Sequence, residues 1–520
     1  MVNNKLDKID FIFLLALFSI SFFIKVQTYP QITAVDEVGY WSETKNINPA
    51  YYYLGLSEQI PFHGPLFFYM NYFIVSISSS LLAFRMPSIL FSFAIIMLFY
   101  IFAKTFFNRK SAFLASLLLV TSTSFNMISI YRIPHIDYCF FSLASLFLFI
   151  LALKTDNGKY LICSFLFAGI AFLISILGVT LLAALAVSLL LVKNNFVKFS
   201  NYKHFEIGIS KYFWIAFGAL ILLILICSPM QILKREAIVR YNNTKNLIQT
   251  EKSMWSGSPF SLQFINRVLF FEGGFSNIFT IIIIIGIIAA FIIPFKNRTL
   301  LPLLIYLIIY SFIMSFSNGM RWYIVPVVMF SYLFFSEAVL IIIKKIFASN
   351  EKNVGYISAM VLIIIVVSVV IIFNLKVSQG YYKNKIESNF INSYLYKDAY
   401  DYLKNKNESG IYALANICEM FRYYSEKDGF NATFFELPRL DLGFTLEETN
   451  KLLPPSHHYY DYVIQLYQAG EEINNRSNLY ATVKDIADKC YLEKTLSNER
   501  FNDPNRKIFI FNCKNISLGS

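Results

Sequence analysis

Long apolar runs alternate with short polar loops along most of the chain. A helix needs about 20 mostly apolar residues to cross a bilayer, and about eleven segments approach this length and composition. They are 10–28, 86–103, 112–130, 138–153, 160–176, 178–192, 212–231, 276–295, 299–316, 322–343 and 355–375. The pattern therefore predicts a mainly α, polytopic membrane protein with about eleven transmembrane helices.

The segment 65–83 is apolar, but Asn71 and several serines interrupt it. The distribution of basic residues decides its placement, because short cytoplasmic loops are enriched in Lys and Arg. If the N-terminus is cytoplasmic and 65–83 does not span, nearly every short basic loop is cytoplasmic. These loops hold Lys104, Arg109 and Lys110; Lys154 and Lys159; Lys193, Lys198, Lys203 and Lys211; Lys296 and Arg298; and Lys344, Lys345 and Lys352. We therefore expect 65–83 to form an interfacial helix in the first outer loop.

The tail from about residue 376 has a different character, with mixed charges and Gly, Pro and Asn turns. Runs at 410–415 and 462–466 are typical of buried strands, and 395–405 and 445–452 of helices. We therefore divide the chain into a transmembrane domain, 1–375, and a small extracytoplasmic α/β domain, 376–520.

Cys490 and Cys513 flank a predicted pair of strands with a turn near 503–505. In an oxidising compartment these two thiols could pair. No C-x-x-C or other metal-binding spacing is found among the six cysteines.

Composition supports the membrane class. The chain is 56% hydrophobic and 15% charged, whereas soluble domains carry about 25% charged residues. Its net charge of +12 could indicate nucleic acid or anionic lipid, but most cations lie in short loops as orientation signals. We expect membrane lipids and no nucleic acid as partners. The bias toward Ile, Lys, Asn and Phe suggests an AT-rich genome and a bacterial inner membrane.

Two groups of carboxylates lie at the predicted outer ends of spans. The pair Asp36-Glu37 follows the first span, and Asp137 follows the third with Arg132 and His135 beside it. Ionisable groups at the mouth of membrane helices are costly unless they bind something, so they are candidate site residues. Asp36 could instead be an exposed cap, and Asp137 could simply pair with Arg132.

The outer loop 232–275 carries cations against the orientation rule, including Lys234, Arg235 and Arg240. Such side chains grip phosphate oxygens through charge-assisted hydrogen bonds, although a solvated loop on anionic headgroups would look the same. Carboxylates can deprotonate a hydroxyl or hold a divalent metal. A divalent metal on Asp36, Glu37 and Asp137 is possible, and the sequence does not decide whether one is needed. The combination suits transfer of a group from a lipid phosphate.

Several short motifs follow one another in order along the chain. They are Asp36-Glu37, His63-Gly64-Pro65-Leu66, Arg85-Met86-Pro87-Ser88, the basic turn Phe106-Phe107-Asn108-Arg109, Arg132 with Asp137, and Arg321-Trp322-Tyr323-Ile324-Val325-Pro326. Taken together they resemble the GT-C class of membrane glycosyltransferases, most closely the protein O-mannosyltransferase and lipid A aminoarabinose transferase group. Two departures are that Gly64 stands where that group has Pro, and that its frequent Lys-Gly is here Leu177-Gly178.

The resemblance implies transfer of a sugar from a polyprenyl-phosphate donor to a lipid, glycan or protein acceptor on the outer face, usually with inversion. It makes Asp36 the general base or the group that orients the acceptor, supported by Glu37 and Asp137. It places His63, Arg85, Arg132 and Tyr323 in the substrate site, and Lys234, Arg235, Arg240 and Arg321 on the donor phosphate.

Two other functions remain open. A transporter or flippase for a lipid-linked sugar would place its charged groups near the bilayer midplane, often in repeated halves. The charges here gather at the outer mouth, and no internal repeat is visible. A catalytically inactive scaffold is the third possibility.

Overall fold

The computed structural model describes residues 6–28, 35–53, 64–78, 80–155, 157–175, 177–193, 205–227, 268, 277–315, 321–346, 391–406, 408, 410–415, 418–436, 461–468, 490–498 and 503–514. The chain divides into two compact units. The helical unit comprises Met1–Tyr29, Ile47–Ala237 and Ser253–Tyr382, and the C-terminal unit comprises Pro30–Asn46, Ile238–Lys252 and Lys383–Ser520.

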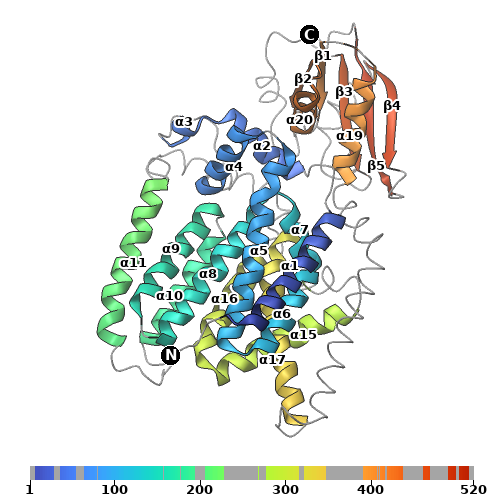
Figure 1. Ribbon diagram of the computed structural model, residues 1–520. Helices are drawn as coiled ribbons and strands as arrows, with labels where there is room; N and C mark the ends of the chain where they lie inside the picture. Colours follow the sequence, from blue (N-terminus) through green and yellow to red (C-terminus); the bar gives the residue numbers. More distant parts are fainter. Residues whose placement is uncertain are drawn as a thin grey trace. The chain divides into compact units, whose positions relative to one another are not determined.

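The helical unit is a bundle (Figure 1). Its helices are α1 (Lys8–Thr28), α3 (Pro49–Tyr53), α4 (Pro65–Ile77), α5 (Leu81–Phe106), α6 (Arg109–Thr121), α7 (Thr123–Ile130), α8 (Pro134–Thr155), α9 (Gly158–Ile174), α10 (Gly178–Lys193), α11 (Phe205–Cys227), α15 (Asn277–Lys296), α16 (Leu301–Ser315) and α17 (Val325–Ile346), with short 3-10 turns η2 (Arg298–Leu300) and η3 (Arg321–Ile324). Helix α9 packs against α8 and α11, and α17 packs against α15 and α6.

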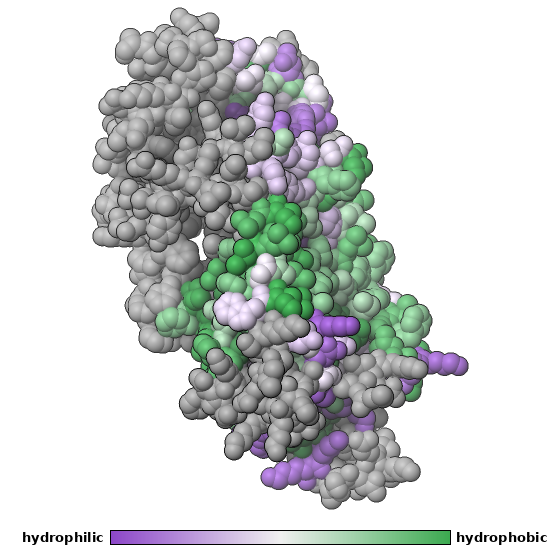
Figure 2. Space-filling view, turned by 90° about the vertical axis from the view of Figure 1, so that its left-hand side faces the viewer, coloured by the Kyte–Doolittle hydropathy of each residue, from purple (hydrophilic) through white to green (hydrophobic). Residues whose placement is uncertain are grey.

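The apolar surface of this bundle is what a membrane protein requires. Large apolar side chains are exposed along several helices, as on α11, where Trp214 is 64% exposed and Leu222 58%. Figure 2 shows green hydrophobic residues gathered over the middle of the visible face, with purple hydrophilic residues below them. Because water would penalise so much exposed apolar surface, lipid is its natural solvent.

The predicted number of eleven spans is not confirmed. By length and composition, four of the described helices could each cross a membrane: Lys8–Val26, Leu81–Phe106, Pro134–Thr155 and Val325–Lys345. The bent pair α6 and α7 could supply one more, and six shorter apolar helices accompany them. The predicted span 355–375 lies outside the described residues.

The single helix predicted over 112–130 is wrong. Helices α6 and α7 meet at Ser122 with a bend of 65°. The Ser122 side chain accepts a hydrogen bond from the backbone N–H of Phe125 at 3.2 Å, and so caps α7. The run Thr121–Ser124 consists of hydroxyl residues, which compete for backbone hydrogen bonds and favour such a break. The apolar run concealed this signal.

The helix expected in the segment 65–83 is confirmed as α4, although its place at a membrane interface stays a prediction. Its 13 residues span about 20 Å, which is less than the hydrocarbon thickness of a bilayer. Phe67, Phe68 and Asn71 are buried, whereas Phe73 and Ile77 on the other face are 66% and 70% exposed. The length and this asymmetry both favour a helix that does not span.

The C-terminal unit contains a five-stranded sheet in the order β2-β1-β3-β5-β4. The strands are β1 (Ile411–Ala415), β2 (Ala432–Glu436), β3 (Tyr462–Gln468), β4 (Tyr491–Asn498) and β5 (Asp503–Asn512), and the helices are α19 (Ile391–Lys404), α20 (Cys418–Asp428) and α2 (Val35–Asn46). Strand β1 is parallel to β2 and β3, whereas β5 is antiparallel to β3 and β4.

Most of the secondary structure expected for the tail is confirmed. The strands at 410–415 and 462–466 correspond to β1 and β3, and the helix at 395–405 to α19. The pair of strands predicted between Cys490 and Cys513 is confirmed as β4 and β5, but 503–505 belong to β5, which begins at Asp503, and not to a turn. The predicted helix 445–452 lies outside the described residues, and β2 and α20 were not anticipated.

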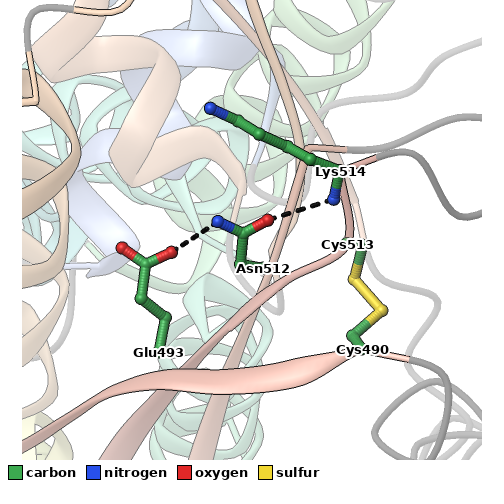
Figure 3. The surroundings of a disulfide bond; sticks show 5 residues. All are labelled: Cys490, Glu493, Asn512, Cys513 and Lys514. Carbon is green, nitrogen blue, oxygen red and sulfur yellow. Dashed lines mark hydrogen bonds between the residues drawn. A yellow bond between two sulfur atoms is a disulfide. The ribbon is translucent and has the colours of Figure 1, made fainter.

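Cys490 and Cys513 form a disulfide that joins the start of β4 to the end of β5 (Figure 3). Beside it, the Asn512 side chain donates to Glu493 Oε2 at 2.7 Å and accepts from the Lys514 backbone N–H at 3.1 Å. Behind this edge Glu408 accepts from Lys514 Nζ at 2.5 Å, and this bond lowers the pKa of the Glu408 carboxyl. The pairing that the sequence allowed for these two cysteines is therefore present in the structure.

Candidate functional site

A buried ion pair lies where α7 passes into α8. Arg132 Nη1 donates to Asp137 Oδ2 at 2.7 Å, and both side chains are fully buried. Asp137 lies in the first turn of α8, where the helix dipole also stabilises a carboxylate. Its second oxygen, Oδ1, has no hydrogen-bond partner among the described residues. The alternative in which Asp137 pairs with Arg132 is therefore realised, and the free lone pairs of Oδ1 leave room for a further role.

Arg132 also joins three helices. Its Nε donates to Asn71 Oδ1 on α4 at 2.7 Å, and its Nη1 lies 3.4 Å from Ser88 Oγ on α5. The guanidinium stacks over the Phe67 ring, with 4.5 Å from Cζ to the centroid. Arg132 thus ties α4 and α5 to the start of α8. Asn71 and Ser88 were not among the predicted site residues, although Asn71 interrupts an apolar run and Ser88 ends the motif that begins at Arg85.

Two other predicted residues of this unit, Arg85 and Tyr323, lie around the same junction. Arg85, one helical turn before Ser88, is fully buried with its Cζ 4.9 Å from the centroid of the Tyr131 ring. Tyr323 in η3 packs edge-on against His135, with the ring centroids 4.8 Å apart. The sequence therefore selected four residues that lie in or against the segment 131–137: Arg85, Arg132, Asp137 and Tyr323.

A group of buried tyrosines continues from this junction. Tyr138 Oη lies 2.9 Å from Tyr306 Oη and 3.3 Å from Thr180 Oγ1. Tyr310 Oη donates to the backbone carbonyl of Tyr323 at 2.7 Å. These hydroxyls find partners inside an apolar bundle, linking α8 to α10 and α16, and α16 to η3.

Gly64 has a steric explanation. A Cβ built on it would lie 2.2 Å from the carbonyl oxygen of Leu173, and its N–H donates to the Ile174 carbonyl at 3.2 Å. The start of α4 is thereby pressed against the end of α9. No side chain fits there, so Gly at this position is a packing requirement of this chain.

The acidic pair Asp36-Glu37 belongs to the C-terminal unit, which the linear sequence did not indicate. Both residues lie in the first turns of α2, and Glu37 is 1% exposed. The joint action of Asp36, Glu37 and Asp137 at one site, which the resemblance implies, stays a prediction.

Helix α2 is held by α20. Trp41 is 7% exposed and meets Tyr423 edge-on, with the ring centroids 5.0 Å apart. Lys45 forms an ion pair with Glu426 and places its Nζ 4.3 Å from the centroid of the Trp41 ring. Burial lowers the pKa of Lys45. The C-terminal unit thus fixes the orientation of the helix that carries the acidic pair.

The remaining predicted residues have no described side chains. His63, Lys234, Arg235 and Arg240 lie outside the described residues, and Arg321 begins η3 without a described side chain. Within the part of the chain that the structure describes, no three His, Cys, Asp or Glu side chains gather as metal ligands.

Comparison with known proteins agrees with this architecture. The family described as dolichyl-phosphate-mannose-protein mannosyltransferase matches residues 62–232, which contain Arg85, Arg132 and Asp137. A search of curated proteins found no matching sequence.

Solved structures match over nearly the whole chain. ArnT from Cupriavidus metallidurans in the apo state has a TM-score of 0.56 at 12% identity, covering 96% of this chain and 97% of that chain. The same protein bound to undecaprenyl phosphate has a TM-score of 0.55 at 12% identity, with the same coverage of both chains. The Archaeoglobus fulgidus oligosaccharyltransferase has a TM-score of 0.53 at 14% identity, covering 88% and 69%. The predicted resemblance to the GT-C class is therefore confirmed at the level of the fold, and the chain is an integral membrane protein.

Proposed function

We propose that this protein is a glycosyltransferase that moves a sugar from a polyprenyl-phosphate donor to a lipid, glycan or protein acceptor on the outer face of the membrane. One observation carries the proposal: the fold matches two kinds of protein that hold polyprenyl phosphates. ArnT was solved with undecaprenyl phosphate, and the oligosaccharyltransferase AglB from Archaeoglobus fulgidus with an inhibitory peptide and a dolichol-phosphate. The family model over 62–232 is named for a dolichyl-phosphate-mannose donor.

The proposed reaction forms one bond and breaks another at the anomeric carbon of the donor sugar. The acceptor oxygen attacks this carbon as its bond to the phosphate oxygen breaks, and polyprenyl phosphate leaves with the electron pair. Asp36 takes the proton of the acceptor or orients the acceptor for attack. Phosphate is a good leaving group, so one principal carboxylate suffices. Lys234, Arg235, Arg240 and Arg321 are proposed to hold the phosphate.

Arg85, Arg132 and Asp137 are proposed to hold the helices around the substrate site in place. The Arg132–Asp137 pair ties together the helices whose ends frame the substrate site, and Arg85 and Tyr323 lie beside it. Glu37 supports Asp36. A divalent metal on these carboxylates is not required by the reaction, because the donor brings its own leaving group.

The function is tested by transfer with purified protein. We expect the protein, reconstituted with membrane extract, to release polyprenyl phosphate and to form a glycosylated acceptor, both visible by mass spectrometry. Comparison of surface glycolipids and glycoproteins with and without the gene identifies the acceptor. A transporter would instead move the lipid-linked sugar across vesicles without releasing polyprenyl phosphate, and that result would refute the proposal.

The packing of α2 on α20 predicts a further effect. Truncating a buried Trp removes about 3–5 kcal/mol of packing, so Trp41→Ala is expected to release α2 and lower the rate of sugar transfer at least tenfold. Steady-state kinetics should show this loss in kcat with little change in donor binding, because α2 carries no predicted phosphate ligand. Tyr51→Ala is the matched control, since Tyr51 is 57% exposed. A Trp41→Ala protein with the wild-type rate would contradict the positioning role of α20.

A further inference from the structure

Helix α1 carries one buried charged residue near each end, and only the first, Asp10, has partners of opposite charge among the described residues. Asp10 near its start is fully buried, and its carboxylate meets Lys104 Nζ at 2.5 Å, Arg109 Nε at 3.0 Å and Tyr100 Oη at 2.8 Å. That charge is compensated by two cations. Lys25 lies near the other end, about 22 Å further along the helix axis at 1.5 Å per residue.

Lys25 has no anionic partner among the described residues. Its side chain is 4% exposed, and its Nζ donates to Ser21 Oγ at 2.8 Å. The rings of Phe93 on α5 and Phe125 on α7 lie on either side, with centroids 5.4 Å and 5.5 Å from Nζ. An ammonium has three donors, so two remain without an oxygen acceptor.

A buried ammonium without an anionic partner lowers the stability of the folded protein. A buried cation without a counter-ion is unfavourable even with aromatic rings beside it, and an ionisable group within a membrane helix is by default a candidate site. The other buried cation with a described ion pair, Arg132, has Asp137. Lys25 therefore requires either a neutral amine or an anion from beyond the described residues.

The surroundings of Lys25 favour a lipid anion. It lies three residues before the end of α1 at Thr28, which places it about 4–5 Å inside the helix end and near headgroup depth. On the same stretch of α1, Phe22 and Val26 are 61% and 55% exposed, so an acyl or prenyl chain can lie against them. An anionic headgroup with an apolar chain matches both features.

We propose that Lys25 is a phosphate-binding residue for the polyprenyl-phosphate substrate, with Ser21 orienting its ammonium and Phe93 and Phe125 closing the site when it is empty. This rests on the proposed function and adds a contact from the first span. The long Lys side chain can rotate its ammonium out from between the rings to meet a phosphate oxygen.

The test uses the purified full chain and measures two quantities. Lys25→Met is expected to weaken binding of polyprenyl phosphate at least about tenfold, as loss of one charge-assisted hydrogen bond implies. The same variant should have a higher melting temperature than the wild type without ligand, because it removes an uncompensated buried charge. Lys25→Arg should keep most of the affinity, and Lys8→Met, at an exposed position of the same helix, should change neither quantity.

The outcomes separate this inference from the proposed function. Unchanged affinity for polyprenyl phosphate in Lys25→Met overturns the inference, whatever the melting temperature of the variant. An equal loss of affinity for vesicles of phosphatidylglycerol identifies the ligand as bulk phospholipid and overturns the donor assignment. If the wild type binds no polyprenyl phosphate at all, the proposed function fails as well, whereas wild-type binding that survives in Lys25→Met leaves that function standing.

Discussion

Replacing Asp36 with Asn is expected to abolish sugar transfer while leaving expression and membrane insertion of the protein intact. The change keeps the shape of the side chain and removes its ability to accept a proton. Positioned general bases contribute about 10²–10⁴-fold to a rate, so the loss should reach at least 10²-fold in kcat. The measurement is single-turnover transfer from a polyprenyl-phosphate sugar by purified protein.

The control for Asp36 comes from its own helix. Glu43→Gln makes the same chemical change further along α2 and should leave the transfer rate near that of the wild type. The pH profile then distinguishes a base from an orienting group. If Asp36 accepts the proton, the wild-type rate falls at low pH as its carboxylate is protonated, and the residual rate of Asp36→Asn lacks this acidic limb. Transfer by Asp36→Asn at the wild-type rate would contradict the role of Asp36 and favour the transporter or scaffold alternatives.

The sequence predicted the architecture better than the site. Long hydrophobic runs identify membrane helices without any knowledge of packing, and short apolar runs in the tail identified β1 and β3. The break at Ser122 was missed because its hydroxyl residues sit within an apolar run, where local capping competes with periodicity. Strand β2 and helix α20 were missed because both are short, with 5 and 11 residues.

The contacts between residues far apart in the sequence could not be predicted from the sequence. Asn71 and Arg132 are 61 residues apart, and nothing in either segment indicates that one bonds to the other. The assignment of α2 to the C-terminal unit depends on Trp41 meeting Tyr423, a contact between opposite ends of the chain. Charge and periodicity could identify Asp36, Arg85, Arg132 and Asp137 as unusual, but only tertiary structure shows which of them are paired.

The most informative of these pairs is Arg132 with Asp137. Removing one member of a buried ion pair leaves an uncompensated charge and costs about 3–5 kcal/mol. Both Arg132→Met and Asp137→Leu are therefore expected to lower the melting temperature of the detergent-purified protein strongly. The double variant Arg132→Met/Asp137→Leu should recover most of that loss, because an apolar pair of similar volume often replaces a buried ion pair at little cost. The control is Lys397→Met on α19, which breaks an exposed ion pair with Asp401 and should cost about 1 kcal/mol or less.

Transfer activity of the same double variant decides what Asp137 does. If stability and transfer both return, the carboxylate serves only to hold the helices together, and its place among the catalytic candidates is lost. If stability returns but transfer does not, Asp137 takes part in the reaction, which its unbonded Oδ1 allows. Single variants as stable as the wild type would contradict the ion pair itself. The experiment works because the pair is fully buried, so that its structural contribution is large enough to be measured apart from any chemistry.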